Sequence, residues 1–119
     1  MASERSEKII QEMVSLSVQT IKLMEKLKLP LSVKDQLTRA ITSVGANFSE
    51  AQDASSKKDF LNKIYIAKKE ASETKYWLAI VSELIGQTNV ELEIIRQEVQ
   101  RFTMMLQKIV NTSKESNRT

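Results

Sequence analysis

The chain contains almost no residues that interrupt a helix. Among its 119 residues there are only two glycines, Gly45 and Gly86, and one proline, Pro30. Lys, Glu, Gln, Leu, Ile and Ala, most of which are good helix formers, dominate the rest. The sequence therefore predicts long helices joined by a few short connections, and no strand pattern competes with them.

Start and stop signals divide the chain into four helical segments. Ser32 with Asp35 and Ser56 with Asp59 have the spacing of capping boxes. Gly86 is placed to end a helix, and Thr88 or Asn89 can cap the next one. The expected helices cover about residues 4–28, 33–54, 57–85 and 90–112, and a polar tail that frays covers 113–119.

Apolar residues repeat at steps of three and four in the first and last segments. The positions in the last are Leu92, Ile95, Val99, Phe102, Leu106 and Ile109, and those in the first are Ile9, Met13, Leu16, Thr20, Leu23 and Leu27. This step is typical of the seam of a helical bundle. Because short connections place neighbouring helices antiparallel, the sequence predicts one all-α domain over residues 1–119, an antiparallel up-down four-helix bundle.

Composition excludes most enzyme chemistry. The chain has no cysteine and no histidine, which removes disulfides, zinc sites, thiol nucleophiles and histidine bases together. The N-terminus is too charged for a secretory signal, and no apolar run approaches the roughly 20 residues that cross a bilayer. We therefore expect a soluble cytoplasmic protein that is not an enzyme, with no cofactor, no metal and no membrane partner.

The third segment carries two apolar faces. One is expected to enter the bundle core: Phe60, Ile64, Ala67, Ala71, Leu78, Val81 and Ile85. The other combines apolar residues with acidic neighbours: Asp59, Ile66, Glu70, Glu73, Trp77, Ile80 and Leu84. A tryptophan-centred stripe rimmed by carboxylates is typical of a subunit interface, so we predict a homo-oligomer. The alternative is an amphipathic surface on which Trp77 lies half exposed.

Carboxylates raise the possibility of a metal site. Glu50, Glu70 and Glu73 could converge, but di-iron bundles use Glu-x-x-His ligands and this chain has no histidine. An all-carboxylate site for magnesium or manganese is the alternative. We favour ion pairs with Arg39 or with a lysine, across helices or across subunits.

Five lysines on the third segment are candidates for binding nucleic acid: Lys57, Lys58, Lys68, Lys69 and Lys75. The first two lie at a helix N-terminus, which itself attracts phosphate. The alternative is a solvated face that keeps the protein soluble. Tyr65, Tyr76 and Trp77 are expected on different faces, so base stacking is not indicated.

The stretch SVGANFSEAQ, residues 43–52, combines a glycine, an asparagine and an acid within one helix. The three-four step places Asn47 in the core seam, where a buried asparagine fixes register. Gly45 falls to the side and permits a neighbouring helix to approach, and Glu50 is placed to receive an arginine or an amide. Together with Arg39, these residues are interpreted as a packing signature.

Residues 37–84 resemble the bacterial 23S rRNA intervening-sequence protein family. The matching motifs are Arg39-Ala40, Ser43-Val44-x-Ala46-Asn47-x-x-Glu50-Ala51, Lys57-Lys58-Asp59-Phe60, Ile66-Ala67 and Glu70-Ala71-x-Glu73-Thr74-x-Tyr76-Trp77-Leu78. Two departures are Ala51, where many members have glycine, and the absence of the aromatic residues common near the N-terminus. The resemblance implies a four-helix bundle that assembles into a ring-like homopentamer. It also implies kinship with the accessory protein of diversity-generating retroelements, which engages nucleic acid and a reverse transcriptase.

These observations favour a non-enzymatic homo-oligomer that contacts RNA or DNA backbone with little sequence preference. A mild positive net charge of +3 permits such binding without requiring it. The alternative is a protein-interaction scaffold that binds no nucleic acid. A reverse transcriptase is an expected partner only for the retroelement branch of the resemblance.

Overall fold

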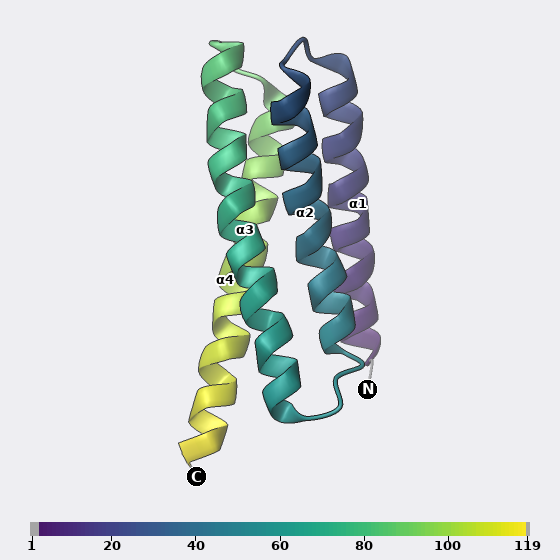
Figure 1. The fold of residues 1–119 in the computed structure, drawn as a ribbon, viewed down its shortest axis with the longest axis vertical. Helices are drawn as coiled ribbons and strands as arrows, with labels where there is room; N and C mark the ends of the chain where they lie inside the picture. The colour runs from purple at the N-terminus through teal and green to yellow at the C-terminus, as the bar shows by residue number, and fades with distance from the viewer. Residues whose placement is uncertain (1–2, 119) are drawn as a thin grey trace.

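The structure, a computed structural model, describes residues 3–118 and the side chains of residues 3–114. Over this range it contains α1 (Glu4–Lys26), α2 (Leu31–Ala51), α3 (Lys57–Ile85) and α4 (Val90–Arg118), and no strand. Figure 1 shows these helices side by side, each running against the one before it, in a body 50 Å long. The predicted all-α four-helix bundle is confirmed.

The helices are arranged as a square in chain order. Each packs against its neighbour in sequence, and α1 closes the square against α4, whereas the described residues of the diagonal pairs do not pack together. The α2–α3 interface is the most extensive and the α1–α4 interface the least. The third helix is therefore held between α2 and α4, with its remaining surface turned outward.

The cores of α1 and α4 follow the predicted seams, with one change near the end of α4. Leu92, Ile95, Val99, Phe102 and Leu106 are all buried, as are the predicted α1 positions from Met13 to Leu23. At the end of the seam Val110 is buried instead of Ile109, which the sequence predicted. Ile109 lines a cavity of about 340 Å³ between the ends of the helices.

Of the three predicted side-chain caps at helix starts, two are confirmed and one is wrong. Ser56 Oγ accepts a hydrogen bond of 3.0 Å from the N–H of Asp59, whose carboxylate accepts one from the N–H of Ser55. Asn89 Oδ1 accepts at 2.9 Å from the N–H of Leu92. The second helix, however, begins at Leu31, so Ser32 lies inside its first turn and caps nothing.

Proline explains the early start of α2. Pro30 occupies the cap position with φ −55°, already close to a helical value, and its carbonyl accepts hydrogen bonds from the N–H groups of Val33 and Lys34. The fixed ring orders the first turn without a side-chain cap. Gly86 ends α3 as predicted, with φ +69° in the left-handed region that favours glycine.

The C-terminal boundary of α4 was predicted too early. The expected fraying tail over residues 113–119 is helical in the structure as far as Arg118, and Thr119 lies outside the described residues. At their own C-terminal ends α1 and α2 stop two or three residues sooner than predicted, at Lys26 and Ala51. Lys114, which the sequence assigned to the tail, therefore lies on a helix, and its side chain reaches Tyr65 of α3.

Gly45 brings α1 and α2 close together. A Cβ atom at this position would lie 3.2 Å from Cβ of Met13, which is tighter than ordinary van der Waals contact. The expectation that this glycine permits the close approach of a neighbouring helix is confirmed. The neighbour is α1, and the contact fixes the spacing of the α1–α2 pair.

Candidate nucleic-acid interface

The five candidate lysines of α3 form a surface that is not neutralised by acids. We call Lys57, Lys58, Lys68, Lys69 and Lys75 the lysine surface. Lys68 is half-buried and the other four are exposed. Within the part of the chain that the structure describes, none of them forms an ion pair. No acid among the described residues therefore pairs with these charges.

The acids on the same stretch of α3 are occupied elsewhere. Asp59 accepts the hydrogen bond from the N–H of Ser55 at the helix N-terminus. Glu70 and Glu73 both point toward α2 and pair with Arg39. Since these acids face the α2 side and the lysines lie elsewhere on the helix, positive and negative side chains of α3 are segregated.

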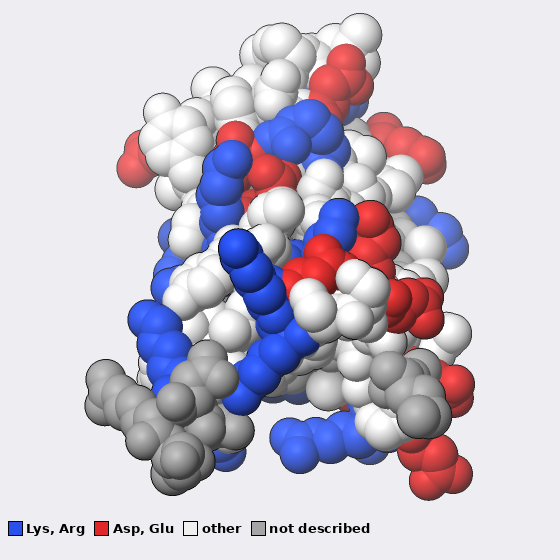
Figure 2. Space-filling view, turned by 60° about the horizontal axis from the view of Figure 1, so that its bottom comes forward, with Lys and Arg blue, Asp and Glu red and all other residues white. Residues whose placement is uncertain are grey.

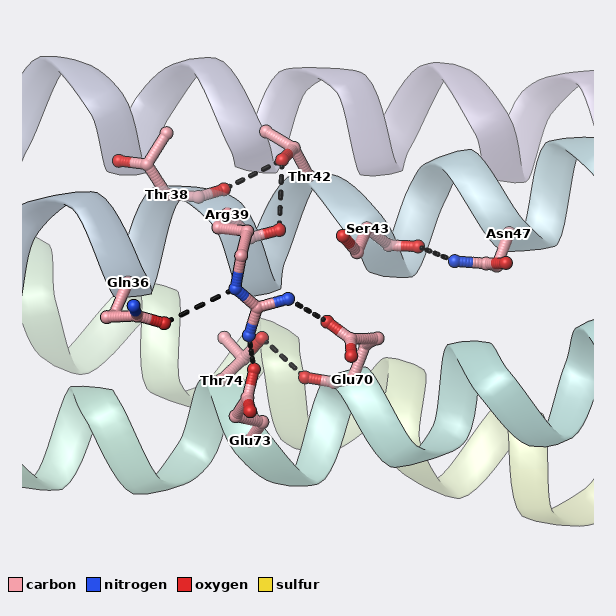
Figure 3. Close-up of polar contacts among 9 residues, drawn as sticks. All are labelled: Gln36, Thr38, Arg39, Thr42, Ser43, Asn47, Glu70, Glu73 and Thr74. Carbon is pink, nitrogen blue, oxygen red and sulfur yellow. Dashed lines mark hydrogen bonds and ion pairs between the residues drawn. The ribbon is translucent and has the colours of Figure 1, made fainter.

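Arg39 joins α2 to α3 through both of its terminal nitrogens (Figure 3). Its Nη1 donates to Glu70 Oε2 at 2.9 Å, its Nη2 is ion-paired with Glu73, and its Nε donates to Gln36 at 3.3 Å. The predicted pairing of these acids with Arg39 is confirmed within one chain. Their assignment to a subunit interface stays a prediction.

Glu50 does not join Glu70 and Glu73 in a metal site. Its Oε1 lies 3.2 Å from Nζ of Lys63 on α3, which is a different partner from Arg39. Among the described residues, no group of three side chains of the metal-binding types is placed to hold an ion. Glu50 thus forms a second link between α2 and α3.

The predicted interface stripe on α3 is partly exposed. Ile66 is 40% exposed and Leu84 50% exposed, whereas Ile80 is half-buried. Trp77 is half-buried and packs against the core of its own chain. Ile66 and Leu84 therefore present apolar surface that no described residue of this chain covers.

The sequence predicted Asn47 in the core seam of α2, but the structure places it beside the seam. Phe48 is the buried residue at this level, and Asn47 is half-buried beside it. Its Nδ2 donates at 2.8 Å to the carbonyl of Ser43, one turn back on the same helix (Figure 3). The side-chain nitrogen is thus hydrogen-bonded within its own helix. The interpretation of a buried, register-fixing asparagine is therefore wrong.

The two tyrosines of α3 share one face, in contrast to the expectation from sequence. Tyr65 and Tyr76 are 40% and 64% exposed, and their separation of three turns returns to the same side of the helix. Only Trp77 is turned away, toward the core. Aromatic rings are therefore available on the outward side of α3.

Lys114 of α4 is a basic residue that sequence reasoning missed. Its Nζ lies 5.9 Å from the centre of the Tyr65 ring, close enough for a cation–π contact. The sequence assigned this lysine to a fraying tail, and only the extension of α4 to Arg118 places it beside α3. The signal that could have found it is the absence of glycine and proline after Gly86.

Charged side chains are also segregated at the end of the bundle that holds the α2–α3 connection. Figure 2 shows Lys and Arg over the left and centre of this face, and Asp and Glu mainly along its right side. The end cavity opens here, and its lining includes Arg5 and Lys108 but no acid. This end is therefore basic on the side where α3 begins.

The fold and its surface define a small four-helix bundle whose lysine surface forms no ion pair among the described residues. Within residues 3–118, no helix combines the length and apolarity that a membrane span requires. The sequence matches the family model described as 23S rRNA-intervening sequence protein over residues 5–108. The chain belongs to this family, as the motifs of residues 37–84 indicated.

A solved structure supports the same assignment. The chain is similar to a protein of unknown function from the S23 ribosomal protein family of Bacteroides thetaiotaomicron, with 30% sequence identity and a TM-score of 0.75. The similarity covers 86% of this chain and 97% of that chain. The comparison with curated proteins finds no match.

Proposed function

We propose that the protein is a non-enzymatic homo-oligomer that binds the backbone of RNA or DNA through the lysine surface of α3, with little sequence preference. The observation that carries the proposal is the set of five lysines on one helix that no acid of the described chain neutralises. The family name, which refers to a ribosomal RNA insertion, agrees with a polyanion as the partner.

Geometry supports contact with several phosphates at once. Lys57 and Lys75 are separated by about 27 Å along α3, at 1.5 Å per residue. Lys57 and Lys58 stand in the first turn, where the unpaired backbone N–H groups and the helix dipole also attract anions. Each phosphate neutralised releases counterions, which gives affinity without reading the bases.

Oligomerisation strengthens a weak surface. One chain carries a formal charge of only +3, but copies held together present several lysine surfaces to one nucleic acid. The exposed apolar residues Ile66 and Leu84 support self-association. The family resemblance supports a ring of five subunits, and the cytoplasm is the compartment in which such a ring would meet RNA.

The direct test is fluorescence anisotropy with a structured RNA and a duplex DNA across a salt series. We expect affinity to fall steeply with salt. The slope of the logarithm of the association constant against the logarithm of the salt concentration should become shallower by about one for each phosphate-contacting lysine removed. The test variant replaces Lys57, Lys58, Lys69 and Lys75 by glutamine. A control replaces three lysines outside α3: Lys22, Lys28 and Lys34.

Equal loss of affinity in the two variants would show that binding is not located on α3. Absence of binding by the unaltered protein at low salt would refute the proposal. Circular dichroism of both variants checks that the substitutions leave the fold intact.

A second candidate function is a protein-interaction scaffold without nucleic-acid binding. It is favoured by a shallow, uncharged groove between α1 and α2, in which Val14 and Val18 are exposed. A pulldown that recovers one stoichiometric protein, unchanged by nuclease, would favour this candidate. A reverse transcriptase would be the partner if the gene lies beside a retroelement.

A further inference from the structure

The outward face of α3 alternates basic and aromatic side chains. Lys58, Tyr65, Lys69 and Tyr76 follow one another at steps of seven, four and seven residues, and each step returns to nearly the same side of an α-helix. All four side chains are exposed. We call these four residues the tyrosine–lysine stripe.

Both rings are supported without being covered. The Tyr76 ring stands edge-to-face against Trp77, with centroids 5.6 Å apart and planes at 78°. Because Trp77 itself packs against the core, this contact fixes Tyr76 at the surface. Tyr65 has the Lys114 ammonium 5.9 Å from its ring centre, which adds a cation beside the ring.

The spacing along the helix suits an extended strand. Tyr65 and Tyr76 are about 16 Å apart along the axis, at 1.5 Å per residue. An extended single strand spans this distance with a few nucleotides. Lys69 lies between the two tyrosines on the same side of the helix, and its exposed side chain can reach the backbone that joins the stacked bases.

We propose that the tyrosine–lysine stripe binds single-stranded nucleic acid, with unpaired bases on Tyr65 and Tyr76 and phosphates on Lys58 and Lys69. This inference rests on the proposed function and narrows its ligand. Exposed aromatic rings cannot stack on the bases of a duplex, because those bases are already stacked on one another inside it. Any unpaired base, in contrast, offers a face on which a ring can stack. Stacking of this kind does not discriminate among sequences.

The experiment compares three ligands at one salt concentration by fluorescence anisotropy. They are a single-stranded oligonucleotide, the duplex of the same sequence, and an abasic single strand of equal length that retains only the phosphates. We expect the unaltered protein to bind the single strand more tightly than the duplex and the abasic strand. RNA and DNA versions of the single strand are tested in parallel.

Variants separate the rings from the charges. Replacing both Tyr65 and Tyr76 by serine should weaken binding of the single strand by about tenfold or more for each ring, down to the level of the abasic strand. The abasic strand and the duplex should bind the serine variant as they bind the unaltered protein. Tyr65→Phe with Tyr76→Phe is the matched control and should keep most of the affinity, because the ring remains.

Each other outcome overturns the inference in a recognisable way. Equal binding of all three ligands, with no effect of the serine variant, would refute base stacking on the tyrosine–lysine stripe. It would still agree with backbone binding by the lysine surface. Binding of none of the ligands at low salt would overturn both. Loss of binding to all three ligands in the serine variant would show that the tyrosines act on assembly or folding, which size-exclusion chromatography and a thermal melt would register.

Discussion

The Nη1 of Arg39 on α2 lies 2.9 Å from Oε2 of Glu70 on α3, whose side chain is only 11% exposed. A guanidinium at the surface thus reaches a carboxylate that the bundle has almost enclosed. Since the same guanidinium is also paired with Glu73, one side chain compensates two acids. The segregation of charge on α3 depends on this link.

Removal of Arg39 should destabilise the bundle. Arg39→Met leaves the Glu70 carboxylate nearly buried without its cation, and we expect the free energy of unfolding to fall by about 2 kcal/mol. Glu70→Gln in the Arg39→Met background should recover part of this loss. Urea unfolding followed by circular dichroism measures both changes.

The matched control for this prediction is Lys63→Met. It breaks the other α2–α3 ion pair, with Glu50, but Glu50 remains largely in solvent, so the expected loss is below about 1 kcal/mol. Equal losses for Arg39→Met and Lys63→Met would show that the burial of Glu70 carries no special cost.

Substitution of Gly45 tests the close approach of α1 and α2. Alanine normally stabilises a helix interior relative to glycine by up to about 1 kcal/mol. Here the added Cβ meets Cβ of Met13 at 3.2 Å, and overpacking of this kind costs about 1–3 kcal/mol. We therefore expect Gly45→Ala to lower the thermal midpoint. A rise in the thermal midpoint would show that α1 can shift to accommodate the added methyl group without loss of stability.

The two serines that precede or begin helices should behave differently. Ser56→Ala removes the side-chain cap of α3 and should cost about 1 kcal/mol of unfolding free energy. Ser32→Ala should be nearly neutral, since α2 begins at Leu31 and Ser32 makes no cap bond. Urea unfolding of the two variants side by side measures the difference. A loss at Ser32 equal to that at Ser56 would contradict the observed start of α2.

Assembly through α3 can be tested at two exposed residues. Ile66→Glu combined with Leu84→Glu places charge in the apolar stripe without opening the core, and we expect the oligomer to dissociate. Leu31→Glu with Val90→Glu, at exposed positions in the first turns of α2 and α4, is the control and should leave the oligomer intact. Sedimentation velocity distinguishes the species, and a monomeric unaltered protein at micromolar concentration would sink the oligomer proposal.

Most of the fold follows from local signals in the sequence. The seams of α1 and α4, the cap at Ser56 and the left-handed Gly86 depend on periodicity and backbone sterics, which one segment contains by itself. The sequence-based predictions were wrong where packing against a neighbouring helix, or a second local signal, determines the structure. Pro30 ordered the first turn of α2 without Ser32, and Val110 replaced Ile109 beside a cavity that no single helix reveals.

The charge of the candidate site could be predicted from the sequence, whereas the contacts among its residues could be predicted only in part. The lysine surface follows from helical spacing, but the three partners of Arg39 depend on how α2 lies on α3. Asn47 shows a different limit, since a three-four step cannot tell it from Phe48 as the core residue. The shared face of Tyr65 and Tyr76 was available from their spacing alone, and Lys114 required the true length of α4.

The even number of helices brings the start of α1 and the end of α4 to the same end of the bundle, beside the α2–α3 connection (Figure 1). A segment fused before α1 or after α4 therefore emerges at the end of the bundle where α3 begins. An affinity tag there would stand in the path of a strand approaching Lys57 and Lys58, and a polyhistidine tag would add its own cations. A labelled site in the α3–α4 connection, at the far end, leaves that approach open.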